Sequence, residues 1–148
     1  MTNKPAPTDD PVPFDEDEHA GLARHLDTNF LINALVAGTP EDQRLRHWIR
    51  QGVVISVSSV GWAEFLCGPV SEEDRQRARK VVGAPLSLGE MEAAQAAELF
   101  NAGGRKRGTL PDCLIAATAL LAGAALATSN SGDFRRFERA GLKLIADE

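Results

Sequence analysis

The stretch LDTNFLINAL, residues 26–35, decides how the chain is organised. An apolar approach ends at Leu26, and Asp27 follows it directly. The next apolar residues recur at helical spacing, at Phe30, Leu31, Ala34 and Leu35. Asp27 is therefore predicted to lie between the carboxyl end of a strand and the amino end of a helix. In α/β folds this is the edge of the sheet where ligands bind.

Along the rest of the chain, segments typical of strands alternate with segments typical of helices. Strands are predicted at 23–26, 53–57, 84–86, 124–128 and 142–145. Helices are predicted at 27–36, 40–51, 60–67, 72–82, from 87 or 89 to 100, at 111–121 and at 130–137. The alternation predicts an α/β fold with a parallel-rich central sheet of about four to five short strands and helices on both faces. The carboxyl ends of parallel strands meet at one edge of such a sheet.

Composition is that of an ordinary globular domain, with 43% hydrophobic and 25% charged residues in 148. No apolar run is long enough to cross a membrane, and the acidic, Pro-rich amino terminus does not resemble a signal peptide. We therefore expect a cytoplasmic protein. Cys67 and Cys113 lie in apolar helical patterns and are expected to be reduced core residues. Because there is no CxxC motif and the three His share no ligand spacing, a zinc site is disfavoured.

Charge is unevenly distributed along the chain. Residues 1–20 hold six acidic residues, one Lys and four Pro, whereas acids and bases balance in the remainder. Such a segment buries too little apolar surface to offset the entropy of ordering, so we predict a disordered tail over 1–20 and a folded domain over 21–148. The tail is either a solvated arm or an acidic mimic of nucleic acid that covers a basic patch.

Acidic or amide residues follow several of the predicted strands or begin the helices after them. They are Asp27, Glu64 in SSVGWAEFLCG, Asp112 in PDCLIAATALLAG, and Asn130 and Asp133 after ALATS. Taken singly, most have a structural explanation as a helix cap or as a carboxylate in a first helical turn. Glu64 is harder to explain this way, since it lies among apolar residues. A half-buried carboxylate there is costly unless it is paired or bound to a cation.

Together, these residues suggest a metal site. Carboxylates that converge on one point repel each other and stay ionised only when a cation joins them. Oxygen ligands without Cys or His favour Mg²⁺ or Mn²⁺ over zinc. A few carboxylates that hold such an ion form the usual construction of a metal-dependent phosphodiesterase.

The motifs LDTNFLI, SVGWAEFLCG, LPDCLIAATAL and LATSNSGDF occur in this order within about 120 residues. Together they resemble the PIN-domain ribonucleases, and in particular the VapC-type toxins of bacterial toxin–antitoxin pairs. The resemblance covers residues 23–146 and implies a PIN-like three-layer sandwich. It implies that Asp27, Glu64 and Asp112 are metal-binding acids, with Thr28 as a supporting hydroxyl beside the first of them.

The fourth position of the site is ambiguous. The family often has Asp where Asn130 stands, although Asn also occurs. Asn130 offers a carbonyl oxygen near the metal, and Asp133 can add the missing charge. We therefore include Asn130 with the catalytic residues and Asp133 with the metal ligands, and either of them could complete the site.

The resemblance further implies a Mg²⁺-dependent endoribonuclease that acts as the toxin of a type II toxin–antitoxin system. Its substrate would be tRNA or rRNA, and its partners a small antitoxin and a second copy of the chain in a homodimer. Water as the nucleophile implies 5′-phosphate and 3′-hydroxyl products. The Gly-flanked triplet Arg105, Lys106 and Arg107 is the first candidate for RNA contacts, and Arg135 with Arg136 is the second. A basic triplet after a helix can also simply complement the helix dipole.

Two other functions fit the same residues. One is a PIN-type nuclease in RNA maturation without an antitoxin, and the other is a non-catalytic PIN-fold binding module, which Asn130 keeps open. Trp48 and Trp62 could stack on bases. Because both lie on amphipathic helices, we favour packing in the core or a dimer interface.

Overall fold

The computed structural model describes residue 19 and residues 21–145. The predicted tail over 1–20 lies outside the described residues except for His19, so its disorder stays a prediction. The same holds for the last three residues of the predicted domain. No helix in the described part of the chain is long and apolar enough to cross a membrane.

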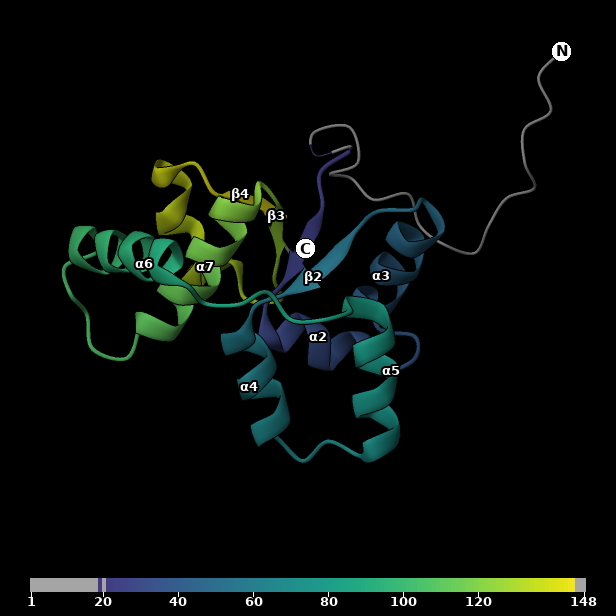
Figure 1. Cartoon of the computed structure of the whole chain (residues 1–148). Coiled ribbons are helices and arrows are strands. Elements are labelled where there is room, and N and C mark those ends of the chain that lie inside the picture. Colours follow the sequence, from purple (N-terminus) through teal and green to yellow (C-terminus); the bar gives the residue numbers. More distant parts are fainter. Residues whose placement is uncertain (1–18, 20, 146–148) are drawn as a thin grey trace, which may run out of the picture.

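The centre of the molecule is a four-stranded sheet in which every neighbouring pair is parallel (Figure 1). The strand order is β2-β1-β3-β4. The strands are β1 Arg24–Leu26, β2 Ile55–Val57, β3 Ala125–Ala127 and β4 Lys143–Ile145. β1, β2 and β3 are buried along their whole length. The predicted parallel α/β sheet is therefore confirmed, with four strands.

Six α-helices and two 3-10 helices connect these strands within the described residues (Figure 1). They are α2 Thr28–Ala34, α3 Pro40–Arg50, α4 Ser59–Cys67, α5 Glu72–Val82, α6 Glu90–Ala102, α7 Leu110–Ala122, η1 Ser131–Asp133 and η2 Arg135–Ala140. Ser58, Thr39 and Ser71 cap α4, α3 and α5 through their hydroxyl groups. Gly123 ends α7 at a φ of 66°, a left-handed conformation that glycine adopts without strain.

The core lies on both faces of the sheet. Successive residues of β3 separate the two clusters, because Ala125 and Ala127 pack with α2, α3, α4 and α5, whereas Leu126 packs with α6, α7 and η2. The expected three-layer sandwich is thus present. Figure 1 shows α6 and α7 together on one side of the strands, away from α3 and α5.

Three local predictions were wrong. The segment 84–86 forms only an isolated parallel bridge between Leu86 and Ser58, because Leu86 alone exchanges backbone hydrogen bonds with Val57 and Ser59. The predicted helix at 130–137 is two 3-10 helices that meet at Phe134. Cys67 is exposed at the end of α4, although Cys113 is buried as expected, and both thiols are free.

Candidate active site at the carboxyl edge of the sheet

A pocket of about 140 Å³ opens at the carboxyl edge of the sheet. It is lined by Asp27, Thr28, Asn29, Glu64, Asp112, Ile115, Asn130, Asp133 and Phe134. The four acids, Asn130 and Thr28 were all predicted from the sequence to belong to one site, and the fold brings them together. They come from the end of β1, from α2, α4 and α7, and from the segment after β3.

Asp27 is the most deeply buried acid of the pocket, with 3% of its surface exposed. One carboxylate oxygen accepts a hydrogen bond from the backbone N–H of Phe30 at 2.8 Å, so Asp27 does cap α2. The other oxygen accepts a hydrogen bond from the hydroxyl of Thr128. Burial raises the pKa of Asp27 to about 6, against the lowering effect of these two hydrogen bonds, and the charges of Asp112 and Glu64 raise it further. Asp27 is thus a helix cap, and it is also a carboxyl group whose charged form is disfavoured by its surroundings.

Glu64 reaches the pocket from α4. Its carboxylate accepts a hydrogen bond of 2.6 Å from the hydroxyl of Thr28. Gly61, one turn earlier, allows α4 to pack closely against the end of β2 and the start of α2. A β-carbon at this position would lie 3.2 Å from the Val57 side chain and 3.6 Å from the Thr28 hydroxyl. We expected Glu64 to be half-buried, and this was wrong, because its side chain lies at the open mouth of the pocket and is exposed.

Asp112 lies in the first turn of α7 and is partly buried. Burial raises the pKa of its carboxyl group, the negative charges of Asp133 and Glu64 add to this, and the Arg136 guanidinium opposes it. The pKa values of Asp27 and Asp112 are thus both raised, first by burial and then by the negative charge of the neighbouring acids.

Asn130 and Asp133 form one unit at the pocket wall. The side-chain amide of Asn130 donates a hydrogen bond of 2.7 Å to the Asp133 carboxylate. Both residues line the pocket and both are exposed. Because they are joined in this way, the pocket contains an amide and a carboxylate at the fourth position, and the geometry does not favour one of them over the other.

Thr128 is the residue that sequence reasoning missed. Its side chain is fully buried, its hydroxyl donates to Asp27, and its oxygen accepts a hydrogen bond of 2.9 Å from the backbone N–H of Asn130. The register that pairs Leu26 with Ala127 places Asp27 beside Thr128. Pairing the two strand ends in the sequence could have revealed it. Asn29, which also lines the pocket, follows Thr28 on α2 and had no comparable signal.

The donor set suits a hard divalent cation, although the acids are not yet gathered around a point. Among the described residues, no three Asp, Glu, His or Cys side chains stand close enough to hold one ion. The hydrogen bonds explain this, because Thr28 holds Glu64 and Asn130 holds Asp133. The described lining of the pocket contains four carboxylates, the two side-chain amides of Asn29 and Asn130, and no imidazole or thiol. Oxygen-only sets of this kind have the ligand chemistry that Mg²⁺ or Mn²⁺ prefers.

The predicted RNA-contacting triplet lies apart from the pocket. Arg105, Lys106 and Arg107 are exposed in the connection between α6 and α7, and none of them lines the pocket. Arg136 is closer, since its charge lowers the pKa of Asp112. The second candidate pair is therefore the one with an electrostatic link to the acids, and a role for the triplet in RNA binding stays a prediction.

The fold and the pocket define an α/β protein with a carboxylate-lined site at the carboxyl edge of a parallel sheet. The family model of the PIN domain matches residues 25–140, and the chain belongs to this family. The resemblance read from the four motifs is thereby confirmed. A comparison with curated proteins gives no match.

Several solved structures have the same fold. VapBC2 from Rickettsia felis, bound to a DNA fragment from its promoter, is 20% identical with a TM-score of 0.63, over 83% of this chain and 97% of that chain. VapBC-1 from nontypeable Haemophilus influenzae is 21% identical with a TM-score of 0.63, over 83% and 96%. A toxin–antitoxin complex from Klebsiella pneumoniae is 26% identical with a TM-score of 0.57, over 76% and 91%.

The raised pKa of Asp27 predicts a specific pH dependence of stability in metal-free buffer. The folded state keeps a proton on Asp27 up to a pKa of about 6, whereas the carboxyl group in the unfolded chain has its ordinary pKa of 3.8. Stability therefore falls as pH rises through this window and stays lower above it. Asp27→Asn removes the charge, so its free energy of unfolding at pH 8 should exceed that of the wild type by about 1–3 kcal/mol. The difference should shrink toward pH 4.

Urea denaturation with a chelator present measures this difference. Glu73→Gln, at an exposed acid in the first turn of α5, is the control and should leave the pH profile unchanged. An Asp27→Asn variant less stable than the wild type at pH 8 would show that the carboxylate stabilises the fold.

Thr128→Val should destabilise the protein and raise the pKa of Asp27 further. The substitution removes the hydroxyl that donates to Asp27 and leaves the N–H of Asn130 without its acceptor, at a cost of about 1–3 kcal/mol. Thr118→Val is the matched control, because Thr118 is also buried and its hydroxyl bonds only to the Leu114 carbonyl. Carboxyl ¹³C NMR titration reads the pKa directly. An unchanged Asp27 titration in Thr128→Val would contradict the assigned hydrogen bond.

Proposed function

We propose that this protein is a divalent-metal-dependent endoribonuclease and the toxin of a type II toxin–antitoxin pair. The observation that carries the proposal is that Asp27, Glu64, Asp112 and Asp133 all line one pocket. Membership of the PIN domain family and a fold shared with VapBC complexes support it.

Asp27, Glu64 and Asp112 would hold the metal ion, with Asn130 and Asp133 completing its surroundings. When bound, Mg²⁺ or Mn²⁺ supplies the positive charge that attracts a phosphodiester and stabilises the negative charge that develops during its hydrolysis. Two hydroxyl groups orient the acids, Thr128 for Asp27 and Thr28 for Glu64. Because Asp27 is fixed by two hydrogen bonds and buried, it is the preorganised member of the set.

Water from the pocket is the proposed nucleophile, so cleavage leaves a 5′-phosphate and a 3′-hydroxyl and does not need the 2′-hydroxyl as attacking group. The pocket itself is strongly negative, so the RNA backbone must be bound by bases at its margin. Arg136, which acts on Asp112, and the exposed triplet Arg105, Lys106 and Arg107 are the proposed contacts. A structured tRNA or rRNA is the substrate class we propose, and the cytoplasm is the site of action.

An apolar pocket supports the proposal of an antitoxin partner. A cavity of about 180 Å³ lies among α2, α4 and the chain that leads into α5. Ile32 and Val36 on its rim are 40% and 57% exposed, so they extend the apolar surface of the cavity outward. A short amphipathic helix of the antitoxin would fit there by its apolar face. We also propose a homodimer for the toxin itself.

Purified protein should cleave RNA in the presence of Mg²⁺ or Mn²⁺ and lose cleavage when a chelator is added. Asp112→Asn and Glu64→Gln should lower the rate by about 100-fold or more, because each removes a charged ligand from the metal site. Glu73→Gln is the matched control for Glu64→Gln, since Glu73 is an exposed helical acid remote from the pocket lining. The measurement is single-turnover cleavage of a total tRNA preparation, followed by analysis of the product ends.

Equal cleavage by the wild type and both pocket variants would contradict the catalytic assignment. Metal binding without cleavage of any RNA would favour the non-catalytic binding module. Cleavage by a protein whose expression is harmless, and which no neighbouring gene product inhibits, would favour a nuclease of RNA maturation.

A further inference from the structure

A second pocket lies at the opposite edge of the sheet from the acids. It has a volume of about 260 Å³ and is built from the amino ends of β1 and β2 and the carboxyl end of α3. The residues that line it are Gly21, Leu22, Ala23, Arg24, His47, Trp48, Gln51, Gly52, Val53 and Val54. This described lining contains an arginine and a histidine but no Asp or Glu.

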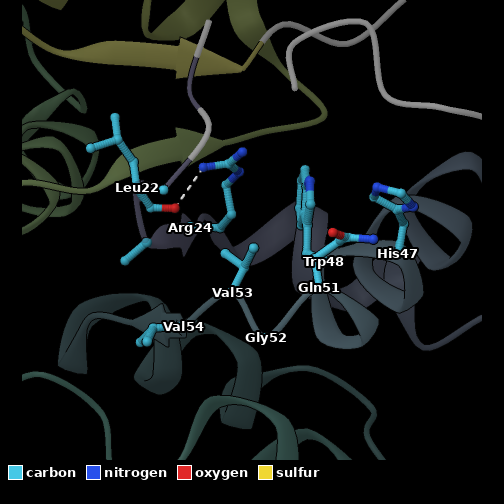
Figure 2. A pocket seen from close by; sticks show the side chains of 10 residues that line it. Leu22, Arg24, His47, Trp48, Gln51, Gly52, Val53 and Val54 are labelled. Atoms are coloured by element: carbon cyan, nitrogen blue, oxygen red, sulfur yellow. Dashed lines mark hydrogen bonds between the residues drawn. The ribbon is translucent and has the colours of Figure 1, made fainter. Parts of the chain in front are cut away.

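Arg24 and Trp48 form the inner wall of this pocket. Figure 2 shows the two side chains next to each other, and the Arg24 guanidinium lies 5.3 Å from the centre of the indole. Arg24 is only 2% exposed, and it donates hydrogen bonds to the carbonyl oxygens of Leu22 at 2.7 Å and His19 at 2.9 Å. A buried guanidinium is stabilised by negative charge close to it. The Arg24 guanidinium thus fixes the backbone of the residues that precede β1.

Trp48 contributes an unused donor. The indole is 2% exposed, and its N–H has no hydrogen-bond acceptor among the described residues. Buried indole N–H groups usually have an acceptor, so this one indicates an acceptor that the described chain does not provide. A carboxylate or a backbone carbonyl in the pocket would satisfy it.

Further positive charge surrounds the pocket on α3. Arg44 lies 6.0 Å from the centre of the Trp48 ring, and Arg50 is in the last turn of the helix. The acids of α3 are engaged near its amino end, where Glu41 accepts from Ser129 and Asp42 accepts from Arg46. Complementation of the helix dipole explains Arg50, but it does not explain Arg24, which belongs to β1. The pocket and its rim are therefore cationic.

We propose that the acidic segment 15–18 of this same chain docks in this pocket, with its carboxylates on Arg24, Arg44 and the Trp48 indole N–H. Its sequence is Asp-Glu-Asp-Glu, four consecutive acids that match the charge of the pocket. The segment also enters from the correct place, because Gly21 is part of the pocket wall. At about 3.3–3.6 Å per extended residue, the three to six residue steps from Gly21 to these acids span at most roughly 10–20 Å, so the chain is long enough for the acids to reach the pocket.

Tethering favours this occupant over a free one. A segment joined to the pocket by a few residues has an effective concentration on the order of millimolar. A phosphate group of a nucleic acid would have the same chemistry but would have to displace the tethered carboxylates. The docked segment thus keeps the basic edge of the protein covered. The proposal does not depend on the nuclease function, because this pocket and the acidic one lie at opposite edges of the sheet.

Proteolysis of the folded, full-length chain tests the docking from the side of the pocket. A Glu-specific protease cuts after Glu16 and Glu18, and docking slows this cut. In Arg44→Gln/Arg50→Gln the tail is unchanged, and cleavage there should become about two- to tenfold faster, as expected for two partly exposed charges. The matched control is Arg75→Gln/Arg79→Gln on exposed positions of α5, which should cleave at the wild-type rate. Equal rates in the wild type and both variants would overturn the proposal.

A second test of the docking changes the acidic segment 15–18 and observes the NMR signal of the Trp48 indole N–H. The cross-peak should shift when residues 15–18 are neutralised as Asp15→Asn, Glu16→Gln, Asp17→Asn and Glu18→Gln, and should stay in place in the control Asp9→Asn/Asp10→Asn. In the wild type, high salt should move it toward the position in the neutralised variant. An unmoved peak would overturn the docking. If inorganic phosphate shifts the wild-type peak as far as that of the neutralised variant, the pocket is an open phosphate site and the proposal is also overturned.

Discussion

The burial of Asp27 beside other carboxylates is the constraint on which the acidic pocket at the carboxyl edge of the sheet depends. Its side chain is almost fully buried and its pKa is raised to about 6, first by loss of solvent and then by the charges of Asp112 and Glu64. Two like charges 4 Å apart repel by about 4 kcal/mol at an effective dielectric of 20. If this position contributed to stability alone, a neutral side chain would be more favourable there than a carboxylate. Its presence is consistent with a site that is completed by a cation.

The parallel sheet explains why the acids must meet. Residues that follow adjacent parallel strands lie side by side, and the register that pairs Leu26 with Ala127 places Asp27 next to Thr128. Two of these acids also have a structural position at the start of a helix. Asp27 caps α2 while it lines the pocket, and Asp112 occupies the first turn of α7 while it faces the other acids. Structural and functional explanations of these residues were therefore not alternatives.

Much of this arrangement could be predicted from the sequence, because the signals were local. The helix caps Thr39 and Ser71, the β-branched run before Ser58 and the order of the four motifs determine the elements and the side of the sheet where the acids gather. The wrong prediction for Glu64 and the omission of Thr128 both concern contacts between distant segments. The exposure of Glu64 is set by how α4 rests on Thr28, and the role of Thr128 is set by strand register. Neither is visible in a window of a few residues.

Short, irregular segments were also beyond sequence reasoning. Residues 130–137 were predicted as one helix but form parts of two 3-10 helices, since the segment begins with Asn, Ser, Gly and Asp, which favour turns over an α-helix. The cationic pocket at the amino edge was not predicted either. It is assembled from β1, α3 and the chain before β2, and only the fold brings Arg24 to Trp48. The two edges of one sheet thus have opposite charge.

The most direct test of the central claim is the effect of divalent metal on stability at pH 8. The free energy of unfolding should be measured by urea denaturation for the wild type and Asp27→Asn, with increasing Mn²⁺ or Mg²⁺. The wild type should gain stability as the ion concentration rises, by about 2.7 kcal/mol at one hundred times the dissociation constant. Asp27→Asn should gain almost none. Equal stabilisation of both proteins, or of neither, would contradict a shared cation site organised around Asp27.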